Sequence, residues 1–133
     1  MISCVDTNVF LDIVMADPHF ADSSHTALRR ARQSGSVIIC DLVYAELAPQ
    51  FESKELLDAT LGLLGVQIVD SGSDVSFLAG TKWGDYRKSG GSRLRMPADF
   101  MIGAHALLRG DCLLTRDRGF YKSYFPELRL LQP

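Results

Sequence analysis

The sequence predicts an α/β fold built on a parallel sheet, because short apolar runs alternate with helix-length segments along its 133 residues. Five runs rich in Val, Ile, Leu and Cys are predicted to be strands: residues 2–5, 37–40, 66–69, 112–114 and 128–131. The first, second and fourth runs are nearly continuous in apolar residues, which is typical of strands buried on both faces of a parallel sheet. At this length we expect a single domain over residues 1–133.

Helices are predicted between these strands, where apolar residues recur with helical spacing. The predicted helices cover residues 9–15, 21–33, 42–48, 54–64, 74–86 and 98–109. Several ends carry punctuation: Gly35 and Gly65 follow helices, Pro49 ends the third, Pro97 fits the first turn of the last and Gly110 closes it. The result is a βαβ alternation.

The composition, 47% hydrophobic and 23% charged, is that of a globular protein rather than a disordered or membrane protein. The apolar run at residues 2–15 is interrupted by Asp6, Asn8 and Asp12, and no basic residue precedes it. It is therefore expected neither to span a bilayer nor to act as a signal peptide. We expect a cytoplasmic protein that does not enter membranes.

The cysteines and histidines do not suggest a zinc site, because their spacing matches no metal motif. The three cysteines lie in three separate strand-like runs and are expected to be buried, reduced thiols: Cys4, Cys40 and Cys112. The three histidines are expected to be at the surface or half-buried: His19, His25 and His105.

Charge is unevenly distributed along the chain, although the net charge is only −2. Residues 1–80 hold 4 Lys or Arg and 11 Asp or Glu (−7), whereas residues 81–133 hold 10 and 5 (+5). This asymmetry permits a basic surface beside an acidic centre. Sorting of charges onto solvated helix faces explains it equally well, and both interpretations stay open.

Four acids lie in apolar surroundings where a strand ends or a helix begins: Asp6, Glu46, Asp99 and Asp117. Asp6 directly follows the first strand, and Asp117 lies three residues beyond the fourth. Ligands of open parallel sheets bind beyond the carboxyl ends of the strands, so these acids are expected to meet at one edge. An ionised carboxylate in apolar surroundings costs several kcal/mol unless it is paired or bound to a cation.

Carboxylates without histidine or cysteine partners select hard cations such as Mg²⁺ or Mn²⁺. A hydrated cation of this kind suits phosphate chemistry, because it polarises a phosphoryl oxygen and lowers the pKa of bound water. Nearby polar side chains could cap helices or orient the acids in support: Thr7, Asn8 and Thr115. The remaining acids considered are interpreted as caps or surface charges: Asp12, Asp41 and Asp111.

Four arginines are candidates for contact with a substrate phosphate. Arg93 and Arg95 belong to the basic stretch at residues 87–95, and Arg116 and Arg118 flank Asp117. The stretch at 87–95 could equally be a solvated connector. Arg116 and Arg118 could either neutralise the acidic cluster or contact a substrate phosphate.

Four runs of the sequence resemble the PIN domain, and in particular the VapC-type toxin ribonucleases. They are VDTNVFLD at residues 5–12, YAE at 44–46, MPADF at 96–100 and LTRDRGF at 114–120. The likeness continues through residues 125–133 and so covers essentially the whole chain. In the position of Gly119 many relatives carry a further acid, so the resemblance does not extend to an additional metal contact there.

This resemblance implies a three-layer fold with strand order 3-2-1-4-5. It implies that Asp6, Glu46, Asp99 and Asp117 form a catalytic metal site supported by Thr115, dependent on Mg²⁺ or Mn²⁺. It further implies endonucleolytic cleavage of single-stranded or looped RNA, homodimers, and a small antitoxin whose C-terminal segment occupies the active-site groove. The apolar helix pair at residues 42–64 could form that groove, although core burial explains most of its leucines.

Two alternatives remain at this stage. The first is a metal-binding or RNA-binding module of the same fold without catalysis. The second is an aspartyl-phosphate phosphotransfer domain, since an acid after the first strand also suits that chemistry. It fits poorly, because no second acid lies two residues after Asp6 and neither a P-loop nor G-x-G-x-x-G occurs.

Overall fold

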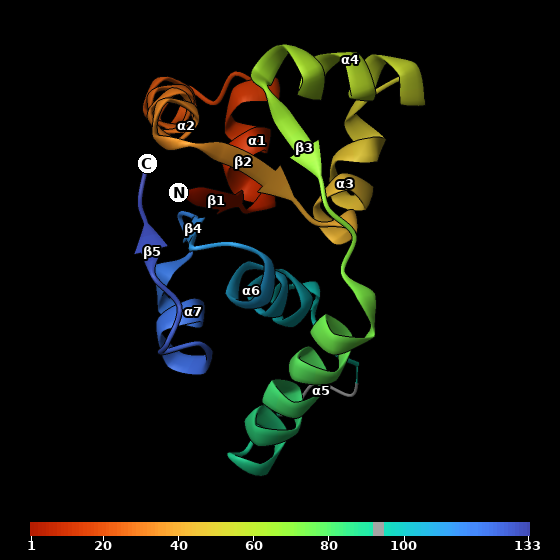
Figure 1. The fold of residues 1–133 in the computed structure, drawn as a ribbon, viewed down its shortest axis with the longest axis vertical. Helices are drawn as coiled ribbons and strands as arrows, with labels where there is room; N and C mark the ends of the chain where they lie inside the picture. Colours follow the sequence, from red (N-terminus) through yellow and green to blue (C-terminus); the bar gives the residue numbers. More distant parts are fainter. Residues whose placement is uncertain (92–94) are drawn as a thin grey trace.

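A parallel five-stranded sheet forms the centre of the protein (Figure 1). The structure, a computed structural model, describes residues 1–91 and 95–133. The strands are β1 (Ile2–Val5), β2 (Ser36–Ile39), β3 (Val66–Ile68), β4 (Cys112–Leu114) and β5 (Leu130–Leu131). Their order is β3-β2-β1-β4-β5 and every pairing is parallel, which confirms the predicted α/β class and strand order.

The central strand β1 explains why the apolar runs are continuous. Cys4 pairs with Ile38 of β2 on one side and with Leu113 of β4 on the other, and all three are buried. Strands covered on both faces have no solvent side for polar residues. β5 is shorter than predicted, because Leu128 belongs to the turn before it, where its N–H donates to the carbonyl oxygen of Phe125.

All six predicted helices are present, with ends within two residues of the expected ones. In the described residues the helices are α1 (Thr7–Val14), α2 (Ala21–Ser34), α3 (Asp41–Leu47), α4 (Lys54–Leu64), α5 (Gly72–Lys88), α6 (Ala98–Arg109) and α7 (Arg118–Tyr124), with a 3-10 turn η1 (Ala48–Gln50). α7 was not predicted. Its seven residues are mostly aromatic or polar, without a helical apolar repeat, and its start depends on the Asp117 side chain accepting from the N–H of Phe120.

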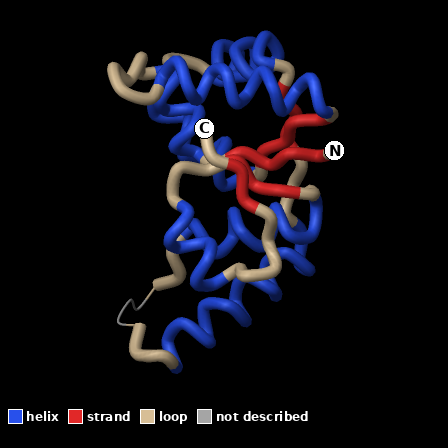
Figure 2. Tube along the Cα trace, turned by 90° about the vertical axis from the view of Figure 1, so that its left-hand side faces the viewer, coloured by secondary structure: helices blue, strands red, loops and turns tan. Residues whose placement is uncertain are grey.

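The helices cover the two faces of the sheet in separate layers. Figure 2 shows the strands as a central band with helices above and below it. Helices α1, α2 and α4 lie on one side and α5, α6 and α7 on the other (Figure 1), while α3 contacts both α1 and α6. α4 ends at Gly65, whose φ of 70° is the left-handed conformation that favours glycine. This three-layer arrangement leaves the carboxyl edge of the sheet to the loops and helix ends that follow the strands.

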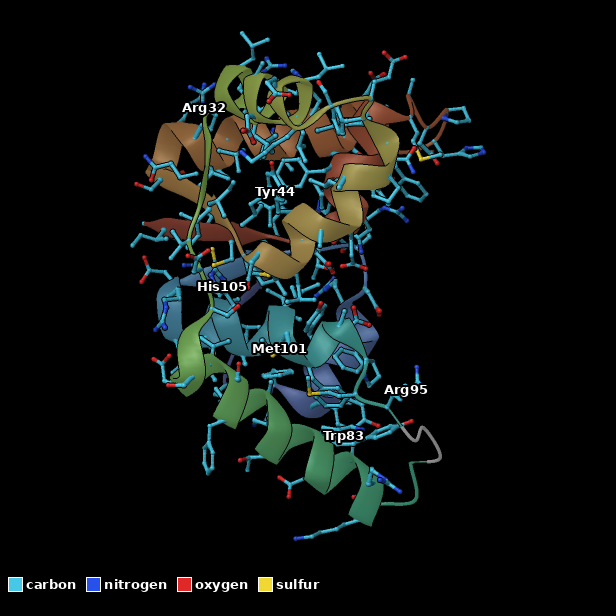
Figure 3. The ribbon with its side chains drawn as sticks, turned by 90° about the vertical axis from the view of Figure 1, so that its right-hand side faces the viewer. Arg32, Tyr44, Trp83, Arg95, Met101 and His105 are labelled. Atoms are coloured by element: carbon cyan, nitrogen blue, oxygen red, sulfur yellow. The ribbon has the colours of Figure 1, made fainter. Side chains whose placement is uncertain are left out.

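The cysteines are buried and free, as predicted, and burial raises the pKa of the Cys4 thiol to about 12. The prediction for His105 was wrong. It is only 1% exposed, and its Nε2 lies 2.6 Å from the carbonyl oxygen of Val69 (Figure 3). Burial lowers the pKa of this imidazole, so it serves as a neutral core group joining α6 to the chain after β3. Among the described helices, none is both long and apolar enough to cross a bilayer.

Candidate active site

Asp6 lies at the carboxyl end of the central strand, between β1 and α1. Its N–H donates to the carbonyl oxygen of Leu114 and so continues the ladder toward β4. Its side chain then caps α1, since Oδ1 accepts from the N–H of Thr7 at 2.7 Å. One residue thus ends a strand and begins a helix, which leaves its carboxylate only 4% exposed.

The other oxygen of Asp6 is held by side chains from the far end of the sequence. Thr115, directly after β4, donates from Oγ1 to Asp6 Oδ2 at 2.7 Å, and Tyr121 of α7 donates from its hydroxyl at 3.2 Å. Asn8 adds a longer contact of 3.4 Å from Nδ2 to the same oxygen. Thr115 and Asn8, both named from the sequence, therefore contact the same oxygen of Asp6.

Glu46 reaches the same neighbourhood from α3. Thr7 Oγ1 donates to Glu46 Oε1 at 2.9 Å, so Thr7 contacts Asp6 through its N–H and Glu46 through its hydroxyl. Glu46 is itself exposed. Its negative charge contributes to raising the pKa of Asp6, which brings the two acids into one electrostatic environment.

Asp117 and Asp99 lie at the starts of α7 and α6. Asp117 is exposed at the start of α7, and its N–H donates to Thr115 Oγ1 at 3.0 Å. Asp99 is half-buried in the first turn of α6. Both charges, together with that of Asp6, raise the pKa of the buried Tyr121 hydroxyl. The four acids named from the sequence therefore gather around Asp6 and Tyr121.

The pKa values of Asp6 and Tyr121 are raised mainly by burial, with a smaller contribution from neighbouring carboxylates. Burial is the main reason why the pKa of Asp6 lies above its ordinary value, and the hydrogen bonds from Thr115, Thr7 and Tyr121 oppose that rise. For Tyr121, burial again contributes most and the three carboxylates add to it, so its hydroxyl stays protonated as a donor. A cation at this edge would relieve the cost of ionising Asp6.

Tyr121 was not identified from the sequence. It is fully buried in a run of aromatic residues that reads as core. The available signal was its spacing: four residues after the helix-capping Asp117, it lies one helical turn further along α7. A tyrosine fully buried beside acids needs a partner for its hydroxyl, and Asp6 provides it.

The expectation that Asp12 is a cap or surface charge was wrong. It is 3% exposed and accepts two hydrogen bonds from Arg116, from Nε and from Nη2, each at 2.8 Å. Ser24 Oγ of α2 donates to the same carboxylate at 2.7 Å, and the guanidinium of Arg116 stacks over the ring of Phe20 with 4.1 Å to its centroid. The expectation fails because Asp12 lies on the inner face of α1, where α2 and the loop after β4 cover it.

The four arginines named from the sequence have different surroundings. Arg116 is engaged by Asp12, so its charge holds the loop between Thr115 and Asp117 against α1. Arg118 is exposed and donates to Gln132 Oε1 at 2.7 Å. Arg95 is exposed beside the end of α5 (Figure 3), and Arg93 lies outside the described residues.

The acids do not by themselves form a closed metal cage. Within residues 1–91 and 95–133, no three His, Cys, Asp or Glu side chains are arranged to grip one ion together. Their chemistry nevertheless suits a hard cation, since the donors are carboxylate oxygens. Mg²⁺ commonly retains several waters and binds through one or two carboxylates plus substrate phosphates. The arrangement is compatible with an ion of that kind and not with a fully protein-coordinated one.

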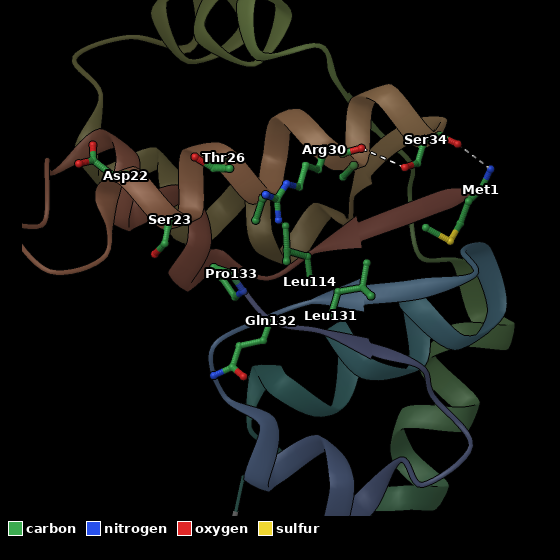
Figure 4. A pocket seen from close by; sticks show the side chains of 12 residues that line it. Met1, Asp22, Ser23, Thr26, Arg30, Ser34, Leu114, Leu131, Gln132 and Pro133 are labelled. Carbon is green, nitrogen blue, oxygen red and sulfur yellow. Dashed lines mark hydrogen bonds between the residues drawn. The ribbon is translucent and has the colours of Figure 1, made fainter.

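A cavity away from the four acids lies between α2 and the C-terminal strand, and none of the four lines it. About 460 Å³ is enclosed between α2 and the C-terminal strand, with Arg30, Thr26 and Leu131 among its lining residues (Figure 4). Its one acid is Asp22, exposed on α2. Size alone therefore does not mark the candidate site in this chain.

Comparison with known proteins gives a family and a fold. The model of the PIN domain family matches residues 3–126. A chain in the crystal structure of VapBC2 from Rickettsia felis bound to a DNA fragment from its promoter is similar, with 23% identity, a TM-score of 0.75 and coverage of 99% of this chain and 98% of that one. No curated protein matches the sequence.

Two further solved structures contain chains that are similar to this one. A chain of VapBC-1 from nontypeable Haemophilus influenzae has 21% identity and a TM-score of 0.71, with 99% and 98% coverage. A chain of a toxin-antitoxin complex from Klebsiella pneumoniae has 19% identity and a TM-score of 0.62, with 97% and 95% coverage. At these identities the likeness shows a shared fold.

Proposed function

This chain belongs to the PIN domain family, and we propose that it is a metal-dependent endoribonuclease that acts as the toxin of a toxin–antitoxin pair. The observation that carries the proposal is Asp6. A buried carboxylate with a raised pKa, oriented by three donors and surrounded by Glu46, Asp99 and Asp117, is costly for stability and is expected where function requires it.

We propose that Asp6, Glu46, Asp99 and Asp117 hold one or two divalent cations, Mg²⁺ or Mn²⁺, with Thr7, Asn8 and Thr115 in support. When bound, such a cation supplies Lewis-acid activation of the phosphodiester and of water. The protein residues position it. Thr115 fixes Asp6 through one bond and the N–H of Asp117 through another, so the two acids keep their relative orientation.

An antitoxin partner is part of the proposal. A groove of about 360 Å³ lies between α3, η1 and the start of α4, with Tyr44, Phe51 and Leu57 among its lining residues. Leu57 belongs to the core, but its neighbour Leu56 in the first turn of α4 is 49% exposed. An apolar groove beside an exposed leucine suits an amphipathic peptide segment. We also propose a homodimer in the cytoplasm.

The first test is cleavage of total cellular RNA by the purified protein with Mn²⁺, with Mg²⁺ and with EDTA. We expect discrete fragments that require metal. Asp6→Asn and Asp99→Asn should each lower the rate more than about 100-fold, because even outer partners of a metal ligand are worth roughly 10–100-fold.

Asp22→Asn is the matched control, since it makes the same change on exposed α2 and should cleave like the wild type. Melting curves establish that all variants fold. Cleavage that persists in both Asp6→Asn and Asp99→Asn, in preparations free of host nuclease, would refute the assignment. Metal binding without turnover of any RNA would favour a binding module instead, and a covalent mass increase with a small phosphodonor would favour phosphotransfer.

A further inference from the structure

An aromatic pocket lies directly beside Asp99. It encloses about 240 Å³ and is formed by Tyr86, Pro97, Asp99, Phe100, Phe120 and Tyr124. These residues come from three helices and the segment before one of them: α5, α6 and α7. The pocket therefore lies where the helices of one layer meet at the acidic edge, and the proposed catalytic carboxylate forms part of its wall.

The rings of this pocket are held in fixed orientations. Phe100 is fully buried and anchors the group, with Phe120 edge-on to it at a centroid distance of 5.0 Å and an interplanar angle of 78°. Tyr86 and Tyr124 form a second edge-on pair at 5.4 Å and 79°. Tyr86, Phe120 and Tyr124 are only partly buried, so each retains ring surface that is not used in the core. Fixed, partly exposed rings offer a stacking surface at little entropic cost.

The size of the pocket limits its occupant. Pockets for drug-sized ligands enclose about 300–1,000 Å³, and this one is smaller. It suits a single planar ring system rather than a whole nucleotide. Ribose and phosphate would remain outside, at the rim where Asp99 lies.

Exposed basic residues neighbour the pocket residues in the sequence. Arg87 and Lys88 directly follow Tyr86 at the end of α5, Lys122 lies between Phe120 and Tyr124 on α7, and Arg95 lies two residues before Pro97. In Figure 3, Arg95 is drawn at the right-hand side of the molecule, above the end of α5. Aromatic rings flanked by cations are the combination that binds single-stranded nucleic acid, with rings taking bases and cations taking phosphates.

We propose that Tyr86, Phe120 and Tyr124 form a subsite for one unpaired base of the RNA, next to the phosphate that is cleaved. A base can enter only if it is not paired within a helix, so the subsite selects single-stranded or looped RNA. This proposal rests on the nuclease function proposed above and adds what that function leaves open, namely how an unpaired strand is chosen.

The test measures binding separately from cleavage, in the inactive Asp6→Asn background. The probes are a fluorescent single-stranded RNA oligomer and an oligomer of the same length whose nucleotides lack bases. Tyr124→Leu and Tyr86→Leu should each weaken binding of the base-bearing oligomer by roughly 5- to 160-fold, the range for loss of one stacked base. Binding of the abasic oligomer should not change, because it has only phosphate contacts.

Phe77→Leu is the matched control, since Phe77 is 78% exposed on α5 and does not line the pocket. Tyr124→Phe keeps the ring and should bind more tightly than Tyr124→Leu. If the Leu variants weaken both oligomers equally, or neither, the subsite is refuted.

A second measurement needs no variant at the pocket. RNA carrying 5-iodouridine is photo-crosslinked to the Asp6→Asn protein, and the attached residue is identified by mass spectrometry. A crosslink at Tyr86, Phe120 or Tyr124 supports the subsite, and crosslinks found only elsewhere overturn it. If the wild type cleaves RNA with metal while these tests fail, only the subsite is wrong; if it neither binds nor cleaves RNA, the nuclease proposal falls as well.

Discussion

The Asp12–Arg116 pair gives a prediction about stability whose size follows from unequal burial. Asp12 is 3% exposed, whereas the Arg116 side chain retains 31% exposure. Removing the arginine leaves a buried carboxylate with Ser24 as its remaining side-chain donor among the residues that the structure describes. Breaking a buried pair in this way costs about 3–5 kcal/mol, and we expect Arg116→Met to lie at the lower end, near 3 kcal/mol, because water reaches the arginine side of the pair.

Removing the carboxylate charge should cost much less. Asp12→Asn can place its amide oxygen where Oδ2 lies, which keeps the bonds from Arg116 Nε and Ser24 and loses the one from Arg116 Nη2, and the guanidinium can turn to water. The loss is then about one net hydrogen bond, roughly 1 kcal/mol. The double variant should be more stable than Arg116→Met alone, because it no longer buries an unpaired charge.

Urea unfolding of the wild type, Arg116→Met, Asp12→Asn and the double variant measures these free energies. Midpoints are compared where the dependence of the free energy on urea concentration has the same slope. Arg118→Met is the matched control: Arg118 is exposed and bonded to Gln132 only among the described side chains, so its loss should stay within about 0.5 kcal/mol. Equal losses in Arg116→Met and Asp12→Asn, or a double variant less stable than Arg116→Met, would show that the carboxylate is not held by this arginine.

Two further predictions concern Asp6. Tyr121→Phe removes the hydroxyl that donates to Asp6 Oδ2 at 3.2 Å. It should lower the free energy of unfolding by about 1 kcal/mol, measured by melting, and metal affinity roughly tenfold, measured by titration with Mn²⁺. Unchanged values would show that the hydroxyl does not position Asp6. Burial raises the pKa of Asp6 in the folded state above 3.8, so the folded protein holds the proton of this carboxyl more tightly than the unfolded chain does. Without metal, the stability that this proton contributes is therefore lost as the pH rises from 3.8 through the folded pKa. Asp6→Asn has no such proton to lose. In EDTA, the melting temperature of Asp6→Asn minus that of the wild type should therefore increase over this pH range, and a constant difference would contradict the raised pKa of Asp6.

The sheet could be predicted from the sequence because its pattern is one-dimensional. Runs such as residues 37–40 are apolar throughout, and neither a helix of that length nor an exposed strand would use such a run. The gathering of Asp6 and Asp117 also followed, since acids after parallel strands share one edge. The strand order came from the family resemblance and not from spacing.

Contacts between distant segments could not be predicted in the same way. Asp12 reads as an exposed helical acid until Arg116, 104 positions later, is known to lie over it. Tyr121 reads as core until its hydroxyl is placed against Asp6. In both cases the side chain has an apolar neighbourhood and one polar partner, and only the partner distinguishes a functional contact from packing.

The hydrogen bonds of Asp6 indicate which of its oxygens can serve a cation. A carboxylate offers about four acceptor positions, two on each oxygen. Oδ2 accepts from Thr115 at 2.7 Å and Tyr121 at 3.2 Å, which fills its share, whereas Oδ1 accepts from the N–H of Thr7. Thr7 also bonds Glu46, so the less occupied oxygen lies on the side of the second acid. Thr115 and Tyr121 thus hold Asp6 through Oδ2. We expect a hydrated cation to bind first at Oδ1, on the side of the carboxylate nearer Glu46.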